Sequence, residues 1–211
     1  MKKIEEFKNY NNEDHGYLIF EKNQLNLNFE IINKIFEKDF NNNKYSKNHY
    51  ENVSIIPREE VLTIDPYNEI LKKLYFKLDV NFKKKISFEN LWLQKSSNSN
   101  YKKDDLPFIP HIDKARKFKV MVYLNDVDLE NGPIFFLNMP GKNFEEKRKR
   151  LSDDHKKNKE NVIYDFKISE YSPAIGKFGT SIFFDTNCPH FAGEQKINKV
   201  RKVLRFNFKL Y

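Results

Sequence analysis

Apolar residues recur at helical spacing in two segments of the first 85 residues. The first segment runs from Phe29 to Asp39 and stops before three consecutive asparagines at 41–43. The second begins at Pro66, and proline is favoured in the first turn of a helix. Its apolar positions are Tyr67, Ile70, Leu71, Leu74 and Tyr75. Both patterns predict helices, and we expect each helix to cover one face of a sheet.

From residue 87 onward the pattern changes to that of β-strands. Segments rich in β-branched and aromatic residues lie at 87–94, 119–127, 131–141, 179–190 and 201–208, with turn residues between them. In the last segment Leu204, Phe206 and Phe208 fall on one face of a strand, and Arg201, Val203 and Arg205 on the other. The prediction is a mainly β fold with peripheral helices. Residues 1–85 would form a helical support and residues 86–211 the β core of one domain, 1–211.

Two polar segments interrupt this strand pattern. Residues 96–106 are rich in Ser and Asn and predict a loop. Residues 144–161 are dense in Lys, Glu and Asp and contain no glycine. The preferred interpretation of this second segment is a charged connector, and a solvated helix or mobile insertion is the alternative.

Composition agrees with a globular β protein and adds little about partners. Aromatic residues make up 15% of the chain, with 20 Phe and 11 Tyr, which is ample material for a core. The net charge of +8 raises the question of nucleic acid, but the lysines are spread along the chain, so a nucleic-acid partner is not expected. The single Cys188 favours a reducing compartment, and no apolar run reaches the length of a signal peptide or a membrane span. We therefore expect a cytoplasmic protein.

The chemistry of the chain concentrates at His111, Asp113 and His190. Side chains at i and i+2 of a strand leave the same face, so His111 and Asp113 can converge on one metal ion. One further imidazole, from His190, completes the two-histidine, one-carboxylate facial triad of non-heme Fe(II) oxygenases. A solvated turn, or an ordinary hydrogen-bonded pair, is the alternative for the His-x-Asp motif alone. Cys188, two residues before His190, is interpreted as a small buried residue rather than a ligand.

The order of motifs around these residues resembles the phytanoyl-CoA dioxygenase branch of the Fe(II)/2-oxoglutarate-dependent oxygenases, over roughly residues 86 to 211. That family has His-x-Asp, a strand, an Asn-Gly-Pro turn, a Pro-Gly turn, a distal His and an Arg. This chain has the corresponding residues at 111–113, 131–133, 140–141, His190 and Arg201, and the last two are 201 − 190 = 11 positions apart. One departure is Pro140-Gly-Lys-Asn143, where the family commonly has Ser-His after the Pro-Gly turn.

The resemblance implies a double-stranded β-helix, a cupin-like jelly roll with N-terminal helices packed on one sheet. It implies that Fe(II) is held by the facial triad, that O2 is a cosubstrate, and that Arg201 binds the distal carboxylate of 2-oxoglutarate through its fork of donors. Gln94 and Asn98 match amides that lie near the cosubstrate in related proteins; an edge-strand amide and a polar loop residue are the alternative. Asp113 favours hydroxylation or desaturation, because related halogenases carry a small residue there.

The cations at Lys114, Arg116, Lys117 and Lys119 follow the metal motif directly. They are interpreted as a solvated strand edge or, alternatively, as an electropositive rim in which Lys117 or Lys119 binds an anionic small-molecule substrate. The predicted function is hydroxylation of an unactivated C–H bond of a small metabolite, with release of succinate and CO2. The alternatives are a jelly-roll binding protein without turnover, an oxygenase of nucleic acid, and a cupin that binds another metal.

Overall fold

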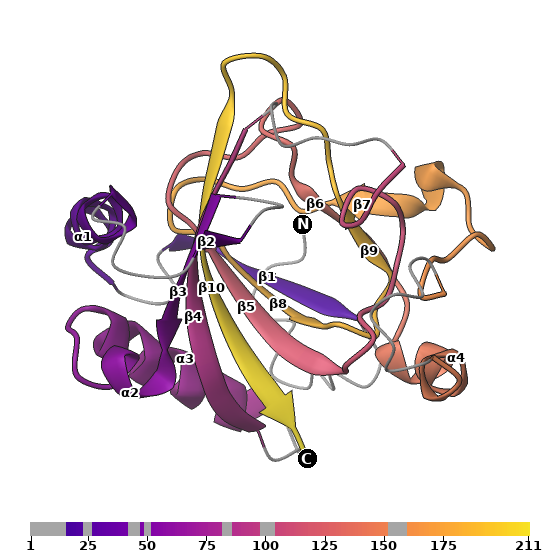
Figure 1. Ribbon diagram of the computed structural model, residues 1–211, viewed down its shortest axis with the longest axis horizontal. Helices are drawn as coiled ribbons and strands as arrows, with labels where there is room; N and C mark the ends of the chain where they lie inside the picture. The colour runs from indigo at the N-terminus through magenta and orange to yellow at the C-terminus, as the bar shows by residue number, and fades with distance from the viewer. Residues whose placement is uncertain are drawn as a thin grey trace.

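A computed structural model describes residues 16–22, 27–41, 47–48, 52–81, 86–97, 104–151 and 160–211. Its core consists of a large antiparallel sheet, a smaller sheet that faces it, and helices on the opposite side of the large sheet (Figure 1). Asn98 lies outside the described residues, as do residues 152–159 of the charged segment 144–161.

The large sheet has seven strands in the order β1-β8-β5-β10-β4-β3-β2. The strands are β1 (Tyr17–Phe20), β2 (Lys47–Asn48), β3 (Asn52–Pro57), β4 (Ile86–Ser97), β5 (Lys117–Tyr123), β8 (Ser181–Asp185) and β10 (Val200–Leu210). The strands predicted within 86–211 are therefore present, and residues 1–85 contribute three further strands besides helices. β10 lies at the centre, between β5 and β4, so its two faces shape both layers of the molecule.

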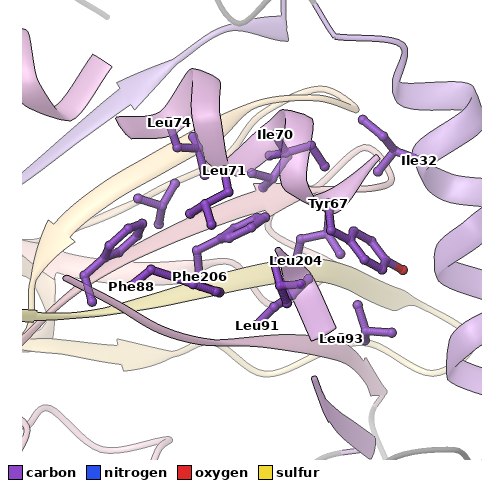
Figure 2. Close-up of a cluster of buried hydrophobic side chains, with 14 of the residues drawn as sticks. Ile32, Tyr67, Ile70, Leu71, Leu74, Phe88, Leu91, Leu93, Leu204 and Phe206 are labelled. Carbon is purple, nitrogen blue, oxygen red and sulfur yellow. The ribbon is translucent and has the colours of Figure 1, made fainter. Parts of the chain in front are cut away.

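Helices cover the outer face of the large sheet, where alternate strand positions are apolar. Helix α1 (Phe29–Asn41) and helix α3 (Tyr67–Asn81) pack there, with the short α2 (Arg58–Val61) between them in sequence. Figure 2 shows Tyr67, Ile70 and Leu71 of α3 meeting sheet residues that include Leu91, Leu204 and Phe206. Both predicted helices are confirmed, although α1 continues to Asn41 and α3 begins one residue after Pro66.

The inner face of the large sheet packs against the small sheet, which has the order β7-β6-β9. Its strands are β6 (Ile134–Leu137), β7 (Tyr171–Pro173) and β9 (His190–Ala192). Met121, Tyr123 and Val203 of the large sheet share a buried cluster with Ile134 and Phe136 of the small one. Two facing sheets with helices on one of them form the predicted jelly roll, and this fold class is confirmed.

The charged segment begins as a short helical stretch beside the small sheet. A 3-10 turn, η4 (Gly141–Phe144), leads into α4 (Glu145–Lys149), and a second 3-10 turn, η5 (Ile168–Glu170), precedes β7. A Cβ atom at position 141 would lie 2.8 Å from Oδ2 of Asp185, so any other residue there would push this carboxylate aside. The Pro-Gly turn thus packs tightly on the segment that leads to His190.

Candidate metal centre

His111, Asp113 and His190 come together at one end of the space between the two sheets. Their ligand atoms all lie within 4.8 Å of one another. Oδ1 of Asp113 is 3.8 Å from Nε2 of His111 and 3.6 Å from Nε2 of His190. Both histidines are buried, and the carboxylate is partly accessible, with 22% of its side chain exposed. Two imidazoles and one carboxylate therefore face a common point and could hold a metal ion there.

The two histidines of the candidate triad are oriented in the same way. Nδ1 of His111 lies 2.8 Å from the carbonyl oxygen of Ile109, and Nδ1 of His190 lies 2.8 Å from that of Cys188. A carbonyl can only accept, so each Nδ1 carries the proton and each Nε2 keeps its lone pair. This is the tautomer that a metal ligand needs, fixed by a hydrogen bond to the far ring nitrogen.

Backbone pairing sets the spacing of the two imidazoles. The amide of His111 donates to the carbonyl of His190 at 3.0 Å, and the amide of His190 donates to the carbonyl of His111 at 2.9 Å. This reciprocal bridge joins the His111 segment to the edge strand β9 of the small sheet. The ring centroids are 4.5 Å apart as a result.

Electrostatics keep the triad in the protonation state that binds a cation. Burial, together with the neighbouring His111, lowers the pKa of His190 to about 3. Burial also lowers the pKa of His111. For Asp113 burial alone would raise the pKa, but Lys119 and the two histidines outweigh it, and the pKa lies well below its ordinary value. The site thus presents two neutral imidazoles and an ionised carboxylate at neutral pH.

The cations that follow the metal motif are engaged within the chain. Nζ of Lys119 lies 2.5 Å from Oδ2 of Asp113, and Nζ of Lys117 lies 2.6 Å from Oε2 of Glu89. Arg116 donates to both carboxylate oxygens of Asp185, from Nε to Oδ1 and from Nη2 to Oδ2. These contacts match neither a freely solvated edge nor an open cationic rim. Any role of Lys117 and Lys119 in substrate binding would compete with these ion pairs.

Arg116 also joins the segments that carry the candidate metal ligands. Its Nη1 atom contacts Oε2 of Glu145 at 3.2 Å, and the same oxygen accepts from the amide of Asn187 at 2.7 Å. Asn187 in turn precedes His190 by three residues, while Arg116 follows Asp113 by three. The network therefore links the Asp113 turn, the His190 turn and helix α4.

Unpaired polar atoms lie on the inner face of β4 and β10. Oε1 of Gln94, Oγ of Ser96 and Nε of Arg201 are buried and have no hydrogen-bond partner among the described residues, as is true of Nε1 of Trp92. Ser96 is paired with Arg201 across the two strands, and Gln94 with Val203. Buried polar groups normally have partners, so this row fits a polar ligand such as a dicarboxylate. Ser96 was predicted as a loop residue, and neither Ser96 nor Trp92 was predicted at the site. The sequence signal that could have identified them is their alternation with the apolar Leu91 and Leu93.

Arg201 and Arg205 share the inner face of β10 but differ in their surroundings. Arg201 is 3% exposed and donates from Nη1 to the carbonyl of Gly132. Gly132 has a φ of +64°, and a Cβ atom there would lie 2.5 Å from the carbonyl of Gly193. The Asn-Gly-Pro turn therefore presents a carbonyl to Arg201. Arg205 instead stacks on Trp92, with Cζ 3.6 Å from the ring centroid.

Comparison with known proteins gives matches of structure only. No family model matches the chain, and no curated protein sequence matches it. Among solved structures, EvdO2 from Micromonospora carbonacea var. aurantiaca is 12% identical, with a TM-score of 0.63 over 99% of this chain and 91% of that chain. The epimerase SnoN in complex with Fe3+, alpha ketoglutarate and nogalamycin RO is 15% identical, with a TM-score of 0.65 over 98% of this chain and 83% of that chain.

HygX from Streptomyces hygroscopicus with nickel and 2-oxoglutarate bound is 10% identical, with a TM-score of 0.61 over 93% of this chain and 83% of that chain. At these identities the likeness establishes the fold alone, a jelly roll that this chain shares with EvdO2, SnoN and HygX. No helix in the described part of the chain is both long and apolar enough to cross a bilayer.

Proposed function

We propose that the protein is a non-heme Fe(II)- and 2-oxoglutarate-dependent dioxygenase of the phytanoyl-CoA dioxygenase-like branch. It would hydroxylate an unactivated C–H bond of a small metabolite. The observation that carries the proposal is the convergence of two Nε2 lone pairs and one carboxylate oxygen, with both Nδ1 atoms bound to carbonyls. This donor set, with one face of the metal left free, suits Fe(II) and a chelating cosubstrate.

The residues on the inner face support 2-oxoglutarate as that cosubstrate. Arg201 would bind the distal carboxylate, and the unpaired atoms of Gln94 and Ser96 lie on the same face to accept or donate hydrogen bonds. Asn98 is proposed as a further contact from the sequence resemblance alone. Bound iron and 2-oxoglutarate would together supply the oxidising chemistry: O2 provides one oxygen atom to succinate and one to the hydroxylated product, and CO2 leaves.

The chain's own residues have separate tasks in this scheme. Lys119 would hold Oδ2 of Asp113, so that Oδ1 alone faces the metal. The buried imidazoles would stay neutral, and the surrounding apolar cluster would keep bulk water from the reacting atoms. We place the enzyme in the cytoplasm, since its single cysteine, Cys188, cannot form a disulfide within the chain.

The proposal is tested by incubating the purified chain with Fe(II), 2-oxoglutarate and O2 and measuring succinate. We expect slow succinate release without added substrate, and none when Fe(II) or O2 is omitted. Calorimetric titration of 2-oxoglutarate should show binding that depends on the metal. A chain that binds neither ion nor 2-oxoglutarate would instead be a jelly-roll binding protein. Succinate release stimulated by single-stranded DNA or RNA, but by no small metabolite, would assign the oxygenase to nucleic acid.

A further inference from the structure

A hollow of about 490 Å³ opens where β3, β4 and β10 meet α2. Its walls include Arg58 and Glu59 of α2, Glu89 and Asn90 of β4, and Lys209 of β10. The volume is in the range of cavities that bind small molecules. None of these residues belongs to the metal centre or to the row of unpaired atoms near Arg201.

Strand register places the hollow on the same face of the sheet as the metal centre. Asn90 pairs with Asn207 across β4 and β10, and Asn207 pairs with Lys119 across β10 and β5. Lys119 contacts the ligand Asp113. Because directly paired residues point to one face, the side chain of Asn90 shares the inner face with Lys119. The side-chain amide of Asn207 donates to Oδ1 of Asn90 at 2.7 Å, so these two side chains contact each other on the inner face.

The hollow also lies at the same end of the jelly roll. Lys209 is paired with Lys117 at the start of β5, only four residues after Asp113. Arg201 is at the opposite end of β10, eight residues from Lys209, or roughly 26 Å along a strand. A metal held by the triad would therefore have the Arg201 row on one side and the hollow on the other.

Positively and negatively charged side chains line the hollow, and not all of them are engaged in ion pairs within the described residues. Glu89 is neutralised by Lys117. Among the described residues, none forms an ion pair with Arg58, Glu59 or Lys209, and all three side chains are exposed. Unpaired cations on two walls and an unpaired carboxylate beside one of them complement a molecule that carries both charges.

From this juxtaposition we infer that the hollow is the substrate site, and that its substrate is a small dipolar metabolite with both an ammonium and a carboxylate group. Lys209 and Arg58 bind the carboxylate, and Glu59 binds the ammonium group. The inference rests on the proposed function for its chemistry, but the binding site itself is testable without turnover. It also assigns substrate binding to cations other than Lys117 and Lys119, which have partners in the chain.

Matched ligands test the charge requirement. Calorimetric titrations of the full chain, without added metal, would use L-alanine, L-leucine and L-phenylalanine. Each would be compared with the acid that lacks the amine and with the amine that lacks the carboxylate. We expect at least one amino acid to bind more tightly than both its matched acid and its matched amine. Lack of binding by all three amino acids up to about 10 mM, or binding no tighter than that of the matched acid or amine, overturns the inference.

Single substitutions locate the site. Lys209→Gln and Arg58→Gln should each weaken the binding of the amino acid and of its matched acid about fivefold. Glu59→Gln should weaken the binding of the amino acid and of its matched amine, but not that of the acid. Lys72→Gln, an exposed position on α3, should change nothing. Binding lost in Arg201→Gln but unchanged in the three hollow variants would place the ligand in the cosubstrate row and refute the inference. Absence of succinate release by the wild type, with binding as expected, would refute only the proposed function.

Discussion

The ammonium group of Lys119 contacts Oδ2 of Asp113, while Oδ1 of the same carboxylate faces Nε2 of both His111 and His190. The two oxygens thus have different partners, and the carboxylate cannot rotate without losing one of them. Lys119 is 12% exposed and reaches this position from β5, which pairs with β10 and β8. A residue of β5 therefore orients the carboxylate of Asp113, a candidate metal ligand that lies just before β5 in sequence.

We expect Lys119→Met to weaken metal affinity about 10-fold or more, because Asp113 would lose the partner that holds its orientation. Lys119→Arg, which retains a cationic donor, should recover most of that affinity. The measurement is a calorimetric titration with Mn(II) or Co(II), with thermal unfolding as a check on the fold. Equal affinity in Lys119→Met and wild type would show that the ion pair has no orienting role.

Each metal ligand should be indispensable. His111→Ala, Asp113→Ala and His190→Ala are expected to lower Fe(II)-dependent succinate release at least about 100-fold, since each removes one of three donors. Circular dichroism should show that the fold is kept. Asp113→Asn, which preserves shape and removes charge, is the matched control for packing. Substantial turnover in any of the three alanine variants contradicts the ligand assignment.

Substitutions of Arg201 and Arg205 should differ in their effect on the binding of 2-oxoglutarate. Arg201→Ala leaves a buried carboxylate without its bidentate partner, a loss on the order of 2–5 kcal/mol in cosubstrate binding. Arg205→Ala removes a cation stacked on Trp92 and should cost much less. The apparent KM for 2-oxoglutarate distinguishes them. A larger increase in Arg205→Ala would identify Arg205 as the anchor.

The network around Arg116 should make the free energy of unfolding depend on pH in the acidic range. Hydrogen bonding by Arg148 is the main cause that lowers the pKa of Glu145 below 4.5, helped by Arg116 and Asn187. A depressed pKa contributes stability that is present above about 4.5 and is lost as pH falls through the lower folded value. Wild type should therefore lose more stability than Glu145→Gln between pH 5 and pH 3, measured by urea unfolding. Identical losses in the two proteins would exclude Glu145 as a source of the dependence.

The helix-covered face of the sheet should dominate stability. Phe206 is fully buried among residues of α3 and β4 (Figure 2). Phe206→Ala should cost about 3–5 kcal/mol in the free energy of unfolding. Phe76→Ala, at a side chain that is 70% exposed on α3, is the control and should change stability little. A small effect at Phe206 would mean that the outer core is less cooperative than its packing indicates.

The alternation of apolar and polar residues along the chain determined which side chains share a strand face in this protein. Leu204, Phe206 and Phe208 had to share one strand face, and that face is the one that the helices cover. The i, i+2 spacing of His111 and Asp113 put both on one side of the chain, and the motif order pointed to His190 and Arg201. These are local properties, because the periodicity of a strand fixes which side chains can act together.

Tertiary structure alone decided the partners of the charged residues. The run Lys114 to Lys119 has the same composition whether it faces solvent, substrate or a carboxylate; only the pairing of β5 with its neighbours brings Lys119 to Asp113 and Lys117 to Glu89. The strands β1 and β3 could not be predicted either, since β1 pairs with β8 and β3 pairs with β4, both more than 30 residues away. Ion pairs and sheet edges depend on which distant residues meet, and a one-dimensional pattern carries no record of that.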